Sequence, residues 1–284
     1  MSRWEAPAKL NLSLLVGERD AGGYHPLRSL VQTIEWVDYL TFEEAESDQL
    51  TVEGAELPEG RDNLVWKAIA ALREAAAITR PLLDIGLKKH IPASAGLGGG
   101  SSDAAASLLA TARLARISPV LAEAVAPQVG ADVPFLMVGG TAWMEGYGEQ
   151  VNPLEVAPDY ALGVVVPPFE LATSSVYSSW DHLGGPPGPE VEGRRLPPSL
   201  RTLGPLRNDL TPAAISVHPD LADWMSEMSA LLERPMLITG SGPAMFGFFA
   251  DLEEAISAMA MAPSSLRAAM ATTPRPHGPT PAAK

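Results

Sequence analysis

A glycine-rich segment that opens a helix constrains this chain more than any other feature. Residues 92–103 read PASAGLGGGSSD, and an alanine-rich run predicts a helix from Ser102 to Ala115. Glycine has no Cβ, so the backbone of such a loop can approach a ligand closely and turn several N–H groups towards it. The start of the helix adds partial positive charge. The segment therefore predicts a site for a di- or triphosphate.

Two better-known phosphate-binding motifs do not fit this loop. A Walker A loop ends in Gly-Lys-Ser or Gly-Lys-Thr, whereas Gly100 is followed by two serines. A dinucleotide fingerprint that began at Gly96 would need glycine at position 101, which is serine. The sequence therefore disfavours a Rossmann-type oxidoreductase. A glycine turn capped by serine, without any ligand, stays the alternative to a phosphate site.

Composition excludes several classes of function. The 284 residues include 20 basic and 34 acidic ones, and the net charge of −14 argues against nucleic acids and anionic membranes as partners. The chain has no cysteine, which excludes disulfides, thiolate catalysis and cysteine-based metal sites. Its apolar runs are too short to span a bilayer, and its start lacks the apolar stretch of a signal peptide. We therefore expect a cytoplasmic protein that holds phosphate by local geometry.

Short β-rich runs predict strands, and amphipathic or alanine-rich runs predict helices. Strands are expected at residues 9–15, 30–37, 39–42, 83–88, 141–144, 161–166, 236–239 and 244–249, and helices at 64–77, 102–115, 121–129, 221–232 and 252–261. Because the two alternate irregularly, the pattern favours an α+β fold with mixed sheets over a doubly wound one.

Polar and proline-rich stretches predict the domain organisation. Residues 148–158 follow a predicted strand and contain two prolines, so we expect an N-terminal domain over residues 1–153 and a C-terminal domain over residues 154–284. Residues 185–198 predict a surface loop. Residues 274–281 predict a frayed end, with the tail disordered from about residue 267.

Further segments carry polar residues of the types that are found in binding and catalytic sites. Lys9 and Asn11 lie two apart on a predicted strand and so project to the same face. Asp132 follows a predicted helix, residues 22–27 read GGYHPL, and residues 238–243 read ITGSGP. Taken singly, each has an ordinary explanation: an edge-strand lysine, a turn aspartate and tight strand connections.

Taken together and in this order, these segments resemble the GHMP small-molecule kinases. The resemblance rests on PAKLN at residues 7–11, GLGGGSS at 96–102, GADVP at 130–134 and the ITGSGP segment, over residues 6–249 of the chain. The GGYHPL segment is similar to the branch of that superfamily whose acceptor is a cytidine diphosphate ester, 4-diphosphocytidyl-2-C-methyl-D-erythritol. The resemblance implies an N-terminal domain like ribosomal protein S5 domain 2, a ferredoxin-like C-terminal domain and an active site between them.

The same resemblance implies ATP as phosphate donor with Mg²⁺, and it assigns roles to individual residues. Asp132 would accept the proton of the acceptor hydroxyl, or position that hydroxyl, with Lys9 beside it. The acceptor would be held by Asn11, Tyr24, His25, Thr173 and Tyr177, of which the last two lie in a segment where Ser174 replaces the family's proline. ATP would be bound by Asn63, Leu64, Lys89, Pro92, Ala95, Gly96, Leu97, Gly98, Gly99, Gly100, Ser101 and Ser102.

Several alternatives stay open at this point. Lys88 and Lys89 could equally be a solvated pair, and His25 could simply close a turn before Pro26. No metal ligand is assigned, and Glu123 fits an ordinary helix surface better than a metal site. Pro127 predicts a truncated helix before Asp132. The chain could instead be a GHMP kinase for mevalonate, homoserine or a sugar, or a catalytically silent nucleotide-binding member. Either a monomer or a homodimer is compatible with the sequence.

Overall fold

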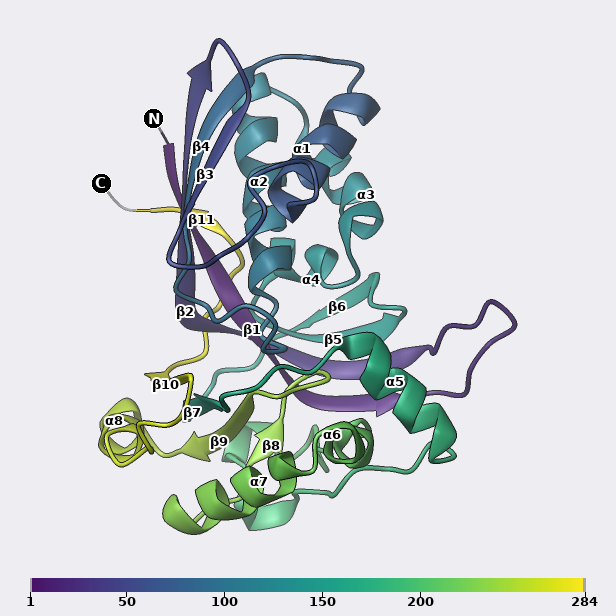
Figure 1. Cartoon of the computed structure of the whole chain (residues 1–284), viewed down its shortest axis with the longest axis vertical. Helices are drawn as coiled ribbons and strands as arrows, with labels where there is room; N and C mark the ends of the chain where they lie inside the picture. Colours follow the sequence, from purple (N-terminus) through teal and green to yellow (C-terminus); the bar gives the residue numbers. More distant parts are fainter. Residues whose placement is uncertain (1, 283–284) are drawn as a thin grey trace.

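The computed structural model describes residues 2–282, which form a larger and a smaller sheet, each packed against helices (Figure 1). The larger sheet has the order β11-β1-β2-β4-β3, with β5 paired to β2 and β6 to β5. Its strands are β1 (Ser2–Val16), β2 (Leu27–Ala45), β3 (Gln49–Glu53), β4 (Leu82–Lys88), β5 (Thr141–Gly146), β6 (Gln150–Leu154) and β11 (Thr280–Pro281). β3 and β4 run parallel, and the other neighbours run antiparallel.

Four helices pack on one face of this sheet, as Figure 1 shows. They are α1 (Leu64–Ala75), α2 (Gly99–Ala115), α3 (Pro119–Val129) and α4 (Val133–Val138). α2 lies between the sheet and its neighbours and buries residues all round, including Ala104, Ala105 and Ala106. Alanine stabilises a helix and takes little room, so this helix can approach the sheet closely. The close packing fixes the glycine-rich loop at its start.

The smaller sheet has the order β10-β7-β9-β8 and is antiparallel throughout. It comprises β7 (Ala161–Val166), β8 (Leu237–Ile238), β9 (Met245–Phe249) and β10 (Ala268–Thr272), with helices α5 (Thr173–His182), α6 (Thr211–Val217), α7 (Asp220–Leu231) and α8 (Leu252–Met259). Two short 3₁₀ helices, η1 (Gly193–Arg195) and η2 (Pro198–Leu200), interrupt the proline-rich stretch. That stretch is irregular, as expected, but it buries Val191 and Leu196 in the core.

The α+β class with mixed sheets is confirmed, with differences at individual elements. The two strands expected at residues 30–37 and 39–42 form one strand, β2, because Asp38 is accommodated inside the core. Its Oδ1 accepts backbone N–H groups of His90 and Ile91 at 2.5 and 2.9 Å. Pro127 does not truncate α3, which continues to Val129. β6 ends at Leu154 and β7 begins at Ala161, and the division of the chain near residue 153 stays a prediction.

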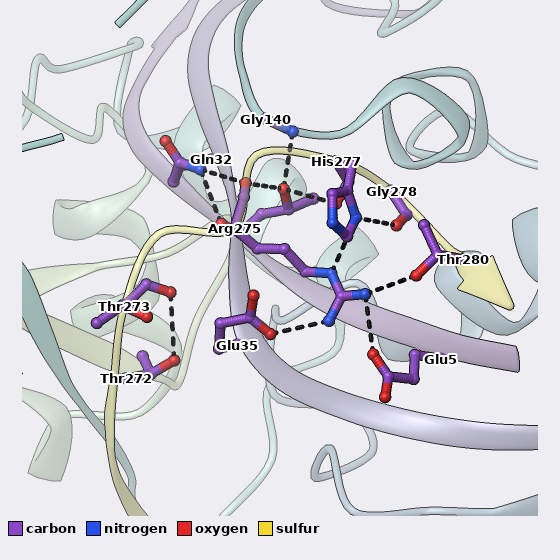
Figure 2. Close-up of polar contacts among 11 residues, drawn as sticks. Glu5, Gln32, Glu35, Gly140, Thr272, Thr273, Arg275, His277, Gly278 and Thr280 are labelled. Atoms are coloured by element: carbon purple, nitrogen blue, oxygen red, sulfur yellow. Dashed lines mark hydrogen bonds and ion pairs between the residues drawn. The ribbon is translucent and has the colours of Figure 1, made fainter. Parts of the chain in front are cut away.

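The prediction of a frayed, disordered tail is wrong. After β10 pairs with β7, the chain returns to the larger sheet, where β11 pairs with β1 (Figure 1). Arg275 holds this return: it is 4 % exposed, and its guanidinium donates to Glu35 Oε2 at 2.8 Å and Glu5 Oε2 at 3.0 Å (Figure 2). The prediction of disorder rested on the proline-rich composition of this segment. Prolines are compatible with an extended chain, however, and do not prevent the ion pairs that hold it in place.

Arg275→Met is expected to lower the free energy of unfolding by about 1–3 kcal/mol, because it removes charged hydrogen bonds to two partly exposed carboxylates. Chemical denaturation measures the change. Arg194→Met, at an exposed position of η1, is the matched control and should stay within about 0.5 kcal/mol of the parent protein. A loss in Arg275→Met no larger than in the control would show that this side chain does not hold the tail.

Among residues 2–282, no helix is both long enough and apolar enough to cross a membrane.

Candidate active site

A cavity of about 680 Å³ lies where the two halves of the molecule meet. Its walls come from β1, the loop between β1 and β2, the glycine-rich loop, the start of α4, α5 and the loop between β8 and β9. The sequence-predicted residues that line it are Lys9, Asn11, Tyr24, His25, Gly96, Gly98, Ser101, Asp132, Thr173 and Tyr177. The structure therefore brings together segments that are widely separated along the chain.

Lys9 and Asp132 face each other in this cavity. Lys9 Nζ lies 3.3 Å from Asp132 Oδ2 and donates to Asn11 Oδ1 at 2.5 Å. Asn11 is fixed in turn, because its Nδ2 donates to Ser29 Oγ at 2.7 Å. Asp132 stands at the N-cap of α4 but makes no capping hydrogen bond, which leaves its carboxylate free for other partners. Because side chains alternate along β1, Lys9 and Asn11 lie on the same face of this strand. The Asp132 carboxylate lies opposite them.

The glycine-rich loop passes directly beside this pair. Gly96 and Gly98 have φ of +82° and +71°, a region that side chains with a Cβ rarely adopt. A Cβ on Gly98 would lie 2.8 Å from Lys9 Cγ, and one on Gly96 would lie 2.6 Å from the Thr239 carbonyl. No side chain caps α2, so its first backbone N–H groups, starting at Gly99, lack an intrahelical acceptor. This cradle of small residues and free N–H groups suits phosphate oxygens.

Gly98→Ala is expected to lower kcat by about tenfold to a hundredfold, because the added methyl group pushes the Lys9 side chain out of place. ATP binding should weaken more than acceptor binding, since the loop must also change conformation. Gly193→Ala is the matched control: Gly193 also has a positive φ, +61°, but a Cβ there would meet no atom within 4 Å. Steady-state kinetics and calorimetry of both variants measure the two effects, and equal behaviour of the two would contradict this packing argument.

Aromatic residues also line the cavity. The ring of Tyr177 stacks on that of His25 with a centroid distance of 5.8 Å, and Tyr24 meets Tyr147 edge-on at 6.1 Å. Tyr24 is 70 % exposed, so its ring is available to a ligand. Burial, and secondarily the charge of Asp132, raises the pKa of Tyr177 to about 12, which keeps its phenol neutral. These rings offer stacking surfaces for a flat ligand.

Thr173 closes the cavity from α5. Its hydroxyl lies 2.9 Å from Ser241 Oγ, in the loop between β8 and β9. Asn208 supports the same loop by donating to the Ile238 and Gly240 carbonyls at 3.0 and 2.8 Å. The second half of the molecule thereby contributes polar groups close to Lys9 and Asn11.

The residues predicted for the adenosine side of ATP are not on this cavity. Asn63 caps α1, accepting from Val65 N at 3.0 Å, and its amide donates to the Pro58 carbonyl at 2.7 Å. Leu64 lies beside Gly100. Outside the cavity wall are also Pro92, Ala95, Leu97, Gly99, Gly100 and Ser102. Ser102 Oγ is buried without a hydrogen-bond partner among residues 2–282. Their ATP contacts stay predictions.

Lys89 is neither on the cavity nor a solvated surface lysine. It is 5 % exposed, and its Nζ contacts a carboxylate oxygen of Asp38 and, at 2.7 Å, Asp103 Oδ2. Burial raises the pKa of Asp103 to about 7, and the Lys89 charge opposes that rise. The alternative of a solvated lysine pair is therefore wrong for Lys89, although Lys88 is exposed. The alternation of β4 predicts this difference, because adjacent side chains point to opposite faces.

Sequence reasoning missed several residues that line the cavity. They include Arg19, Tyr147, Ser174, Ser178 and Asp181. Arg19 could have been found from its place just before the GGYHPL segment. Asp181 gave no comparable signal, since α5 shows no clear helical pattern and was not predicted.

The cavity has side-chain oxygens that fit a magnesium ion carried by a nucleotide. Within the described chain, no group of three or more His, Cys, Asp or Glu side chains could hold a metal ion. Ser101, at the start of α2, and Asp132 are two oxygen-bearing side chains that line the cavity together with Gly96 and Gly98. Mg²⁺ usually keeps several waters and binds phosphates with one or two protein oxygens, so these two residues are sufficient partners for it.

Comparisons with known proteins agree with this arrangement. Residues 63–140 match the GHMP kinases N terminal domain family. The 4-diphosphocytidyl-2-C-methyl-D-erythritol kinase of Pelotomaculum thermopropionicum is 37 % identical over 258 residues, which cover 88 % of this chain and 90 % of that protein. The enzyme of the same name from Acidovorax sp. is 39 % identical over 249 residues, which cover 85 % of each chain.

Solved structures agree as well. A crystal structure of 4-(cytidine 5'-diphospho)-2C-methyl-D-erythritol kinase has a TM-score of 0.77 at 34 % identity, over 96 % of this chain and 98 % of that one. A homoserine kinase from Cytophaga hutchinsonii, with a TM-score of 0.72 and 18 % identity over 98 % and 96 % of the two chains, shares the fold. Fold and cavity thus define the two-domain α+β architecture of the GHMP kinases, as the sequence resemblance implied. Within that class, the chain belongs to the 4-diphosphocytidyl-2-C-methyl-D-erythritol kinase family.

Proposed function

We propose that this protein transfers the γ-phosphoryl group of ATP to the 2-hydroxyl of 4-diphosphocytidyl-2-C-methyl-D-erythritol, a step of non-mevalonate isoprenoid precursor synthesis. The observation that carries the proposal is the 3.3 Å approach of Lys9 Nζ to Asp132 Oδ2. This pair shares one cavity with the phosphate cradle and with the aromatic rings of Tyr24 and Tyr177. A protein that only bound nucleotide would need no carboxylate and cation in that position.

Individual residues of the cavity have separate roles in the phosphoryl transfer. Lys9 Nζ lies 3.3 Å from Asp132 Oδ2, where it orients this carboxylate and places positive charge on the path of the phosphoryl group. The Asp132 carboxylate accepts the hydrogen of the acceptor hydroxyl and orients its oxygen. The N-terminus of α2 receives phosphate oxygens of ATP. Mg²⁺, when bound with ATP, offsets the phosphate charge, and Ser101 and Asp132 are the side chains proposed to contact it.

The acceptor would lie across the cavity, with its base among the rings and its hydroxyl at Asp132. Asn11 holds Lys9 and lines the cavity between these two ends. At a net charge of −14, long-range attraction does not help bind an anionic substrate, so selection must come from short-range contacts. We propose a cytoplasmic enzyme with small-molecule substrates and no nucleic-acid or membrane partner.

A coupled assay of ADP release tests the proposal directly. The purified protein is given ATP, Mg²⁺ and one acceptor at a time: the cytidyl ester, mevalonate, homoserine or galactose. Release of ADP with the cytidyl ester alone, abolished when Mg²⁺ is chelated, is the expected result. Release only with another acceptor would mean a different GHMP substrate, and ATP binding without any release would mean a silent member.

A further inference from the structure

Ser29 on β2 is a buried polar residue that lies behind Asn11. It is 0 % exposed and is not part of the cavity wall, so its hydroxyl is out of reach of a substrate. Its Oγ donates to the Ser13 carbonyl at 2.7 Å and accepts from Asn11 Nδ2 at 2.7 Å. Both hydrogen bonds of this hydroxyl therefore go to β1, the strand that carries Lys9.

The direction of these hydrogen bonds follows from the Ser13 carbonyl. A carbonyl can only accept, so it takes the single proton of the Ser29 hydroxyl. The hydroxyl oxygen can then only accept from Asn11, and the amino end of the Asn11 amide must point towards it. The other end, Oδ1, consequently points towards Lys9 Nζ, which donates to it at 2.5 Å. Ser29 thus determines which end of the amide faces Lys9.

The backbone of Asn11 is held by a different group, which does not orient the amide. Its N–H donates to Thr239 Oγ1 at 2.8 Å. Asn11 and Lys9 are each 4 % exposed, so water has little access to take the place of the Ser29 hydroxyl. A flipped amide would direct its N–H groups at the Lys9 ammonium, which also has only donors. Repulsion between them would move Nζ and change its 3.3 Å separation from Asp132 Oδ2.

We propose that Ser29 is a positioning residue for the phosphoryl transfer: it orients the Asn11 amide, and this amide holds Lys9 Nζ beside Asp132. The inference rests on the proposed function for its reaction. A misplacement of about 1 Å at reacting groups costs up to about a hundredfold in rate. Because Ser29 acts through two other side chains and does not meet substrate, a smaller effect is expected, and it should fall on kcat.

The kinetic test compares Ser29→Ala with the parent protein, using ATP and the cytidyl ester. kcat should fall by about fivefold to tenfold, while KM for ATP and KM for the ester stay within about twofold of the parent values. Ser107→Ala is the matched control and should leave kcat unchanged. Ser107 is also 0 % exposed, and its hydroxyl also donates to a backbone carbonyl, that of Asp103, at 2.7 Å.

A double-mutant cycle separates action through Asn11 from a general effect on the fold. Asn11→Ala removes the amide, so adding Ser29→Ala to it should change kcat by less than about twofold. A parent-like kcat in Ser29→Ala would overturn the inference. So would the same fold-loss from Ser29→Ala with and without Asn11, because a purely structural role would not depend on that amide.

NMR of the Asn11 side-chain amide tests the inference without any turnover. The signal is identified by its loss in Asn11→Ala. Ser29→Ala should shift it and speed the exchange of its protons with water, since the amide loses its acceptor, whereas Ser107→Ala should leave it unchanged. An unchanged signal in Ser29→Ala would contradict the inference. A signal that responds as expected, in a protein that does not phosphorylate the ester, would support the role of Ser29 in orienting Asn11 and contradict only the proposed function.

Discussion

Replacing Asp132 with asparagine is expected to lower kcat by about a hundredfold or more, with ATP binding nearly unchanged. An amide has almost the shape of the carboxylate but cannot accept the proton of the acceptor hydroxyl. It also gives up the attraction between Asp132 Oδ2 and Lys9 Nζ, which lie 3.3 Å apart. Single-turnover kinetics measures the chemical step, and calorimetry with ATP measures binding.

Three further variants serve as comparisons and control for this experiment. Lys9→Met should also lower kcat, and the double variant should lose less than the product of the two single losses, because the residues act as a unit. Glu123→Gln, at an exposed position of α3, should have no effect, which would also dismiss it as a metal ligand. Near-normal turnover in Asp132→Asn would remove the carboxylate from the chemistry.

The parts of this site that are local in sequence could be predicted, and the parts made by folding could not. The two-residue period of β1 put Lys9 and Asn11 on one face, and the glycine-rich loop marked the start of α2. Asp132 came only through the family resemblance, since nothing in its own segment points to Lys9. Asp181 depends on how α5 lies against the loop between β1 and β2, and no pattern near it reports that packing.

Buried charges explain the remaining differences between expectation and structure. Lys89 and Arg275 are both almost fully buried, yet charged residues are rarely buried unless paired. Their carboxylate partners come from distant segments: Asp38 and Asp103 for Lys89, Glu5 and Glu35 for Arg275. Hydropathy along the chain therefore assigns such residues to the surface, and only the fold reveals the pairing.

Lys89→Met is expected to lower the free energy of unfolding by about 3–5 kcal/mol, because it leaves two carboxylates buried without their cation. Asp38 and Asp103 are 0 % and 2 % exposed, and both contact Lys89 Nζ. Lys89 also lies under the glycine-rich loop, since a Cβ on Gly99 would come within 3.2 Å of its Nζ. Urea denaturation at neutral pH measures the loss, with Lys88→Met on the exposed side of β4 as the matched control.

The pH dependence of that loss separates a structural role of Lys89 from contact with ATP. The pKa of Asp103 is raised to about 7 in the folded protein, so the folded state binds a proton more tightly there than the unfolded chain does. Lowering the pH from about 8 to about 5 should therefore protonate this carboxyl and shrink the deficit of Lys89→Met relative to the parent protein. Weaker ATP binding with unchanged stability at every pH would instead place Lys89 at the nucleotide, because the buried carboxylates would then not depend on its charge.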